Sequence, residues 1–243
     1  MSELVHEQAV PPPPFLRRPA GDGWLALLGG GEFSFGETHE ADAAWLAHAG
    51  DGPVGFVPAA SGSVDYGHHF ADYLEGEHGR LVEIVPIYRA RDARRGRNAE
   101  RLAEHAAIYL GGGVADHLID ALAGSPAADA ILERLRAGGV VVAIAAAAQA
   151  LGVVARSIQV GRFVDGLGWL PGGVVETNFD PDHDRRLRQA LGRPGVAWGL
   201  GLPAESAVLL GPGGAVETVG PVFAVEGAEG ELLEFETPAP PEG

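Results

Sequence analysis

Short apolar runs recur along the chain, and each is followed by glycine or proline and then by a segment with helical spacing. Runs of about four to eight residues, rich in Val, Ile, Leu and Ala, are typical of strands buried on both faces of a sheet. The pattern predicts strands at residues 24–28, 54–57, 82–87, 107–110 and 140–145.

Segments with helical spacing lie between these runs. They predict helices at residues 38–49, 64–78, 98–105, 115–122 and 127–137. Ser125 and Pro126 suit the start of the last helix, because serine caps free N–H groups and proline is tolerated in the first turn. Alternating strands and helices predict an α/β fold, a three-layer sandwich around a mainly parallel, doubly wound sheet.

The pattern changes after Gly152, where short β-branched segments alternate with glycine and proline turns. These segments are predicted strands at residues 174–177, 207–210, 216–219 and 222–225. We expect them to form C-terminal β-hairpins that extend the same sheet. One further helix is predicted at residues 182–191.

Proline-rich segments occur at both ends of the chain. The run 11–14 favours extended backbone and predicts an N-terminal arm, residues 1–22, that lies outside the fold. Prolines also follow the acidic segment 229–236 and predict a C-terminal tail, residues 237–243. A single α/β domain is therefore expected at residues 23–236, because domains of this size are common.

The net charge of the chain limits the classes of partner that it is expected to bind. A net charge of −16 argues against nucleic acid or an anionic membrane surface as the main partner. The chain has no cysteine, which excludes disulfides, thiolate metal sites and a cysteine nucleophile. We expect no cofactor and no metal. With no apolar run of membrane-spanning length and no basic, signal-like start, a cytoplasmic location is predicted.

Candidate chemistry lies where predicted strands end, which is where open parallel sheets usually bind ligands. These junctions are segments 29–33, 111–113, 144–148 and 178–179. Their glycines either offer N–H groups to an anion or simply make tight turns. No Gly-Lys-Ser or Gly-Lys-Thr follows, and the spacing of a dinucleotide-binding fingerprint is missing.

The order of these segments resembles the cyanophycinase and dipeptidase E (aspartyl dipeptidase) family of serine peptidases, which shares its fold with class I glutamine amidotransferases. The resemblance rests on segments 27–32 (LLGGGE), 57–61 (VPAAS), 108–113 (IYLGGG), 143–152 (AIAAAAQALG), 166–171 (GLGWLP), 175–179 (VETNF) and 201–207 (GLPAESA). It spans residues 24–225, nearly the whole chain.

This resemblance implies a catalytic triad whose positions carry other residues here. The family's Gly-x-Ser-Ala-Gly turn aligns with residues 144–148, so that Ala146 takes the nucleophile position. Asn178 takes the position of the family's histidine, and an amide is no general base near neutral pH. Both acids of a further family motif are replaced, with Glu205 one position late. We expect a catalytically inactive relative with a binding, regulatory or assembly role.

The backbone of an oxyanion hole does not depend on side-chain identity. The N–H groups of Ala147 and of Gly112 or Gly113 are therefore candidates to bind a small carboxylate or peptide. Because Ile144 and Ala148 replace the glycines of the family's turn, we expect apolar side chains to fill part of the pocket. The resemblance also implies a homodimer. A protein partner is a separate possibility, including a multi-chain complex in which a neighbouring subunit completes the active site.

Two alternatives remain open from the sequence. A hydrolase of acidic dipeptides with a relocated active site would use His183, Glu205 or both, whereas segment 180–184 also suits a helix start capped by Asp180 or Asp182. The arginine-rich segment 89–101 would dock an acidic partner or the chain's own acidic C-terminal stretch, or be a solvated loop and helix face.

Overall fold

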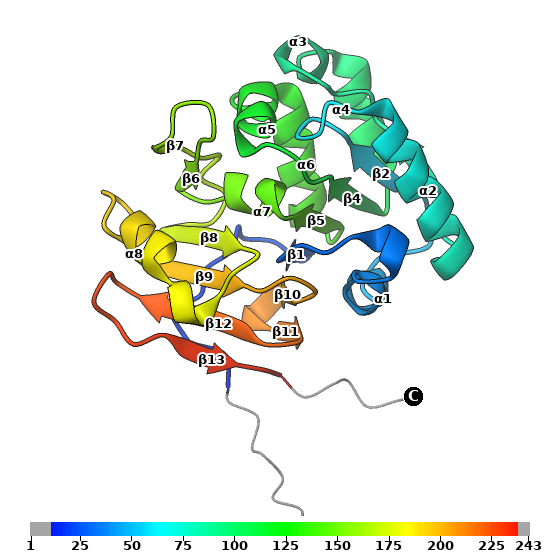
Figure 1. Ribbon diagram of the computed structural model, residues 1–243. Coiled ribbons are helices and arrows are strands. Elements are labelled where there is room, and N and C mark those ends of the chain that lie inside the picture. Colours follow the sequence, from blue (N-terminus) through cyan, green and yellow to red (C-terminus); the bar gives the residue numbers. More distant parts are fainter. Residues whose placement is uncertain (1–10, 238–243) are drawn as a thin grey trace, which may run out of the picture.

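The computed structural model describes residues 11–237, which form two sheets and a short hairpin (Figure 1). The central seven-stranded sheet has the order β11-β10-β1-β5-β4-β2-β3. Its strands are β1 (Trp24–Leu28), β2 (Val54–Val57), β3 (Val82–Ile84), β4 (Ala107–Leu110), β5 (Val140–Ile144), β10 (Ala207–Leu210) and β11 (Val216–Val219). The five strands from β1 to β3 in this order pair in parallel, and β10 and β11 pair antiparallel.

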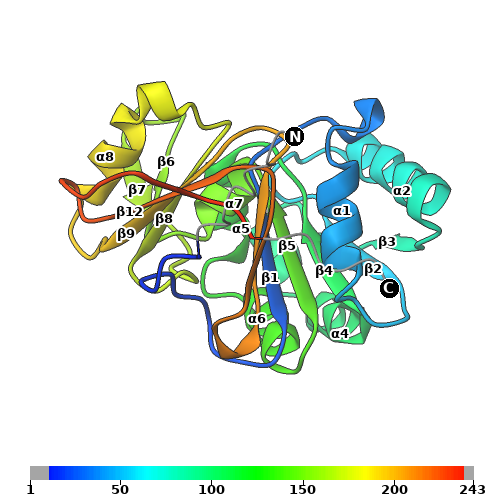
Figure 2. The same cartoon turned by 90° about the horizontal axis from the view of Figure 1, so that it is seen from below.

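Helices cover both faces of this sheet (Figure 2). They are α1 (His39–Leu46), α2 (Val64–His78), α3 (Ala90–Ala93), α4 (Gly96–Glu104), α5 (Ala115–Leu122), α6 (Pro126–Arg136) and α7 (Ala146–Ala150). Along β1, Ala26 and Leu28 pack with residues of α1 and α2, whereas Leu25 and Leu27 pack in a second cluster with residues of α3 to α7. Alternate residues of one strand thus enter two cores, which confirms the predicted α/β fold.

A second sheet follows the central one and was not predicted. It has the order β13-β12-β9-β8 and is formed by β8 (Gly173–Thr177), β9 (Trp198–Leu202), β12 (Val222–Glu226) and β13 (Leu233–Phe235). With α8 (Arg185–Leu191) it builds its own small core. The prediction that all C-terminal strands extend the first sheet is therefore wrong, since only β10 and β11 do so.

The strand β9 escaped prediction because two of its five residues are glycine. Both glycines allow close packing, because a Cβ at Gly199 would lie 2.7 Å from Leu187 Cδ1 and one at Gly201 would lie 2.5 Å from the Phe179 ring. Glycine in a strand often marks such a close approach. These contacts join β9 to α8 and to the loop after β8, and so give the second sheet its separate core.

The remaining short elements are the hairpin of β6 (Val154–Arg156) and β7 (Phe163–Asp165) and three 3-10 turns, η1 (Phe33–Phe35), η2 (Pro181–His183) and η3 (Pro212–Gly214). Ser125 caps α6 through the N–H of Ala128, as predicted. No helix among residues 11–237 combines the length and the apolar character needed to cross a lipid bilayer.

The N-terminal segment contradicts the prediction of an arm outside the fold. Phe15 and Leu16 pack against the larger core, and Arg18 Nε donates to Gly211 O at 2.7 Å. Proline favours extended backbone but does not prevent apolar neighbours from docking. At the other end, Thr237 exchanges hydrogen bonds with Thr218. The rest of the predicted arm and tail, residues 1–10 and 238–243, lies outside the described residues.

Candidate functional site

Three successive carbonyls at the end of β1 accept hydrogen bonds from three residues that are far apart in the sequence. The bonds run from Ala145 N to Leu28 O (2.9 Å), from Asn178 N to Gly29 O (2.9 Å) and from Glu205 N to Gly30 O (3.3 Å). The donors lie in the turns after β5, β8 and β9. One stretch of backbone therefore fixes three loops at one edge of the sheet.

The same three donors are the non-glycine residues with positive φ in the described chain. The angles are 52° at Ala145, 48° at Asn178 and 64° at Glu205. Such backbone costs about 1 to 3 kcal/mol for a residue other than glycine, and it persists only where the surroundings enforce it. The coincidence of all three with the carbonyls of β1 marks this edge as a candidate site.

Ala145 forms the sharp turn between β5, which ends at Ile144, and α7, which begins at Ala146. Its φ of 52° and ψ of −121° are far from both strand and helix values. The strained residue of the turn is thus Ala145. From the sequence it was predicted one residue later, at Ala146. The hydrogen bonds set this position, because Ala145 N continues the pairing with β1 while Ala145 O already accepts from Gln149 N.

A cavity of about 520 Å³ opens beside this turn. Its lining comes from the loops after β1, β2, β4, β5 and β8 and from α2: Gly30, Gly31, Ser61, Tyr66, Gly112, Gly113, Ile144, Ala145 and Asn178. Of the two residues predicted to fill part of the pocket, Ile144 lines the cavity without closing it, whereas Ala148 is buried in the core.

Glycine is required at several points of the lining. A Cβ at Gly30 would lie 2.6 Å from Asn178 Oδ1, and one at Gly113 would lie 2.5 Å from the backbone of Ala60. Both glycines also have positive φ. A Cβ at Gly112 would instead lie 3.8 Å from Ala145 Cβ, an ordinary contact, so Gly112 directly faces the turn.

Three glycine residues of the lining have backbone N–H groups that are free to donate. Those of Gly30, Gly31 and Gly113 donate no hydrogen bond to the residues that the structure describes, whereas the adjacent Gly29 and Gly111 N–H groups do. Free N–H groups in glycine loops suit a negatively charged ligand. Of the predicted binding residues, Gly112 and Gly113 line the cavity, whereas Ala147 is not among the lining residues and its side chain is buried in α7.

Tyr66 is the titratable side chain of the lining, and sequence analysis missed it as a site residue. Burial raises its pKa to about 12, and a backbone hydrogen bond from Gly112 acts in the opposite direction. The hydroxyl is therefore neutral at pH 7. Tyr66 lies on α2 and is separated in sequence from every strand end, so no junction motif could have indicated it.

The lining offers few groups for catalysis. Ser61 Oγ is engaged in its own turn, donating to Pro58 O and accepting from Ser63 N. Asn178 supplies an amide, and neither an imidazole nor a carboxylate lines the cavity. Among residues 11–237, no group of three or more His, Asp or Glu side chains is placed to hold a metal ion. The arrangement can donate hydrogen bonds but holds no general base.

Two candidates for a relocated active site lie elsewhere. Glu205 is exposed and does not line the cavity, although its backbone joins β1. His183 has 81% of its side chain exposed, and its Nδ1 lies 2.7 Å from Asp180 Oδ2, which raises the pKa of the imidazole. The Asp180 side chain accepts from Asp182 N and so caps η2, not α8 as predicted.

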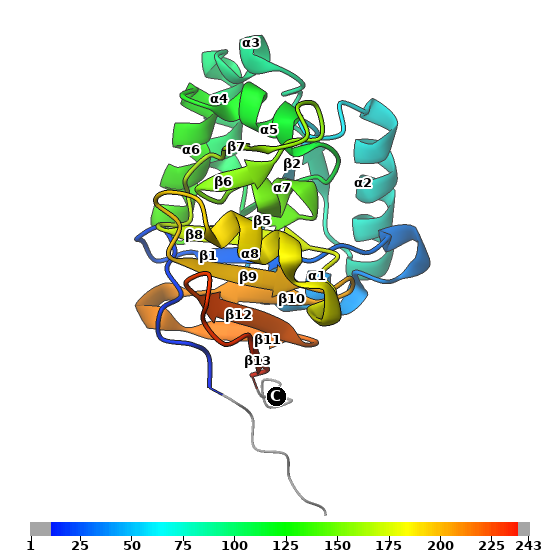
Figure 3. The ribbon, with the colours of Figure 1, turned by 60° about the vertical axis from the view of Figure 1, so that its left-hand side comes forward.

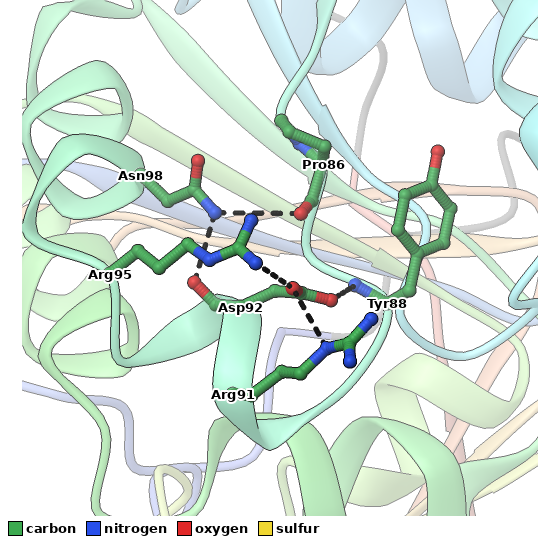
Figure 4. Close-up of polar contacts among 6 residues, drawn as sticks. All are labelled: Pro86, Tyr88, Arg91, Asp92, Arg95 and Asn98. Atoms are coloured by element: carbon green, nitrogen blue, oxygen red, sulfur yellow. Dashed lines mark hydrogen bonds and ion pairs between the residues drawn. The ribbon is translucent and has the colours of Figure 1, made fainter.

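The arginine-rich segment 89–101 is partly structural (Figure 4). Asp92 lies at its centre, accepts from Tyr88 N, and has Arg91 and Arg95 at 3.6 and 3.5 Å. Asn98 then ties the turn to α4 through Asp92 O. The acidic C-terminal stretch does not dock here, because β13 pairs with β12 at the other end of the molecule (Figure 1).

Comparisons with known proteins agree with this geometry. The sequence profile of peptidase family S51 matches residues 25–178, which include the turn at Ala145 and reach Asn178. No curated protein sequence matches the chain. A peptidase from an acI-B1 Actinobacterium is similar in fold (TM-score 0.69, 20% identity, covering 90% of this chain and 99% of that one).

A putative peptidase E protein from Listeria monocytogenes EGD-e is also similar (TM-score 0.61, 18% identity, covering 82% of this chain and 98% of that one). At these identities the solved structures support the fold alone, whereas the profile matches more than half of the sequence. The strained turn, the glycine loops and this match together show that the chain belongs to peptidase family S51.

Proposed function

We propose that this member of family S51 binds a small carboxylate or a short peptide in the cavity beside Ala145 and does not hydrolyse it. The observation that carries the proposal is the side chain at the turn. Ala145 has the strained backbone that presents a side chain to the cavity, and that side chain is a methyl group. A methyl group has neither a lone pair for attack nor a proton to lose.

The base position supports the same conclusion. Asn178 lies across the cavity in a second strained turn, with its Oδ1 against Gly30. An amide does not accept a proton near pH 7. The exposed His183 does not line the cavity, so the hydrolase with a relocated site lacks a base near the bound ligand.

The choice of ligand follows from the donors. Free N–H groups of Gly30, Gly31 and Gly113 and the neutral hydroxyl of Tyr66 surround a cavity that no carboxylate lines. Such donors favour a carboxylate oxygen over a cation. Binding without turnover suits a regulatory or assembly role in the cytoplasm, for the chain alone or as a homodimer, and light scattering after size-exclusion chromatography measures that oligomeric state.

Peptidase assays test the loss of chemistry. We expect no turnover of aspartyl dipeptides by the protein or by the Ala145→Ser variant, because nucleophile and base act as a unit. The double variant Ala145→Ser, Asn178→His is expected to hydrolyse them measurably, and Ala146→Ser is the matched control one residue away. Turnover by the unmodified protein that disappears in His183→Ala would show a relocated active site and overturn the proposal.

Binding is tested by titrating aspartate and an aspartyl dipeptide into the labelled protein. Chemical shifts are expected to change at Gly112, Gly113 and Asn178. The Gly112→Ala variant fits its surroundings and places a methyl group in the cavity, so it should weaken binding, whereas Gly50→Ala, with no atom within 4 Å, should not. Unchanged shifts at all three residues would contradict the binding role.

A further inference from the structure

A second cavity, of about 460 Å³, is lined by residues of the β6–β7 hairpin, of α8 and of the loop after α8. The hairpin and α8 lie close together in the ribbon (Figure 3). Five arginines line it: Arg156, Arg162, Arg185, Arg186 and Arg193. The chain carries 17 cationic side chains and a net charge of −16, yet nearly a third of its cations meet here. No acidic residue lines the cavity, which is therefore an electropositive hollow in an acidic protein.

Most of these guanidinium groups lack a counter-charge. The side chains of Arg156, Arg162, Arg185 and Arg193 make no ion pair or hydrogen bond with residues 11–237. The neighbouring Arg188, by contrast, is bound to Asp184 Oδ2 at 2.8 Å and to the carbonyl of Ala228. Like charges gathered in a hollow repel one another, and an anion at their centre removes that repulsion.

Among the described residues, one carboxylate forms an ion pair with an arginine of the cluster. Glu176 is buried on β8, with its Oε1 3.6 Å from Arg186 Nη1. Burial raises the pKa of Glu176, and the charges of Arg186 and Arg156 act against this shift. A single carboxylate offsets at most one of five positive charges, so the hollow retains an excess of positive charge.

We propose that this cavity binds a small compound that carries two or more adjacent phosphate groups. The planar fork of arginine matches phosphate oxygens with paired hydrogen bonds, and several forks around one hollow match a chain of phosphates. The volume lies in the range of about 300 to 1,000 Å³ that is usual for small-molecule sites. The site shares no residue with the cavity beside Ala145, so it is independent of the proposed function.

Calorimetric titration with inorganic triphosphate tests the proposal at constant ionic strength. The double variant Arg185→Gln, Arg193→Gln is expected to weaken binding at least about tenfold, because it removes two charged hydrogen-bond donors. The control Arg94→Gln, Arg97→Gln removes the same charge from exposed positions on the segment between α3 and α4 and within α4, and should change binding less than about twofold. Thermal unfolding checks that both variants fold.

Further ligands identify the source of the phosphates. Tighter binding of ATP than of triphosphate assigns the site to a nucleotide, and the reverse order assigns it to inorganic polyphosphate. Equal losses in the two double variants would show attraction to the overall charge rather than a site. Binding of citrate as tight as that of triphosphate, or no binding of triphosphate, would also overturn the proposal.

Discussion

The two cavities of this molecule differ in the groups that define them: backbone groups in the first and charged side chains in the second. Beside Ala145, the backbone supplies strained turns, glycine loops and free N–H groups, and the lining side chains carry no charge at pH 7. In the hollow between α8 and the β6–β7 hairpin, ordinary helix and hairpin backbone carries five charged side chains. The first cavity is defined by backbone geometry in a member of family S51. The second is defined by charged side chains on backbone with no unusual geometry.

A fold can therefore retain a site in two ways, through its backbone geometry or through its side chains. Backbone geometry is enforced by many hydrogen bonds and close contacts, so it survives changes of side chain at Ala145 or Asn178. Side-chain sites have no such support and persist only while each residue is retained. A family match therefore reports the framework, while the chemistry has to be examined residue by residue.

The largest expected effect is on the free energy of unfolding, from a substitution in the loop after β1 that lies next to the first cavity. A Cβ at Gly29 would lie 1.9 Å from Pro203 O and 2.7 Å from Leu202 O, both backbone atoms that cannot move aside. We expect Gly29→Ala to lower the free energy of unfolding by more than about 3 kcal/mol. Denaturant titration measures this, with Gly50→Ala as the control that meets no atom within 4 Å; a loss below about 1 kcal/mol would show that the loops tolerate movement.

A smaller effect on stability tests whether the strained residue of the turn is Ala145 or Ala146. Ala145→Gly should stabilise the protein by about 1 kcal/mol, because glycine adopts a φ of 52° without strain. Ala146→Gly, one residue later in α7, should instead cost about 0.5 to 1 kcal/mol of helix stability. The pair is compared by denaturant titration, and the opposite order of stabilities would return the turn to Ala146.

The smallest effect concerns the charges of the second cavity. Burial raises the pKa of Glu176 in the folded protein, so the folded state gains stability at low pH and loses it as pH rises through that pKa. Arg186→Gln removes an opposing positive charge, raises this pKa further and should lower stability more at pH 7 than at pH 4. Because Arg186 is 62% exposed, we expect a difference under about 1 kcal/mol.

Arg185→Gln is the control for this measurement, because Arg185 makes no ion pair with the described residues and does not act on the pKa of Glu176. Its effect on stability should be the same at both pH values. Parallel curves for Arg186→Gln and Arg185→Gln would mean that Glu176 is solvated well enough to be independent of the arginines.

The parallel part of the fold was predictable because its strands are continuous apolar runs, and β1, β2 and β4 begin and end where the sequence indicated. The second sheet was not, since β9 alternates glycine with apolar residues and its glycines are explained only by Leu187 and Phe179 packing on them. Local pattern cannot show which distant side chain fills the space above a glycine.

The two cavities also differed in how far their lining residues could be predicted from the sequence. Gly112, Gly113 and Asn178 drew attention because they follow predicted strands, and the structure places all three in the lining of the cavity beside Ala145. They also lie within the segment 25–178 that matches family S51. The arginine cavity left no mark in the sequence, because its five residues are spread from position 156 to 193. The visible concentration of arginine at 89–101 proved instead to be tied partly to Asp92.

The three carbonyls at the end of β1 also have a consequence for how the chain folds. Each accepts its hydrogen bond from a residue more than a hundred positions later in the sequence. Contacts of such long range require large loops to close first, which slows folding. Ala145, Asn178 and Glu205 can make these hydrogen bonds only when β5, β8 and β9 are in place, so a partly folded state that lacks those strands also lacks the geometry of the cavity beside Ala145.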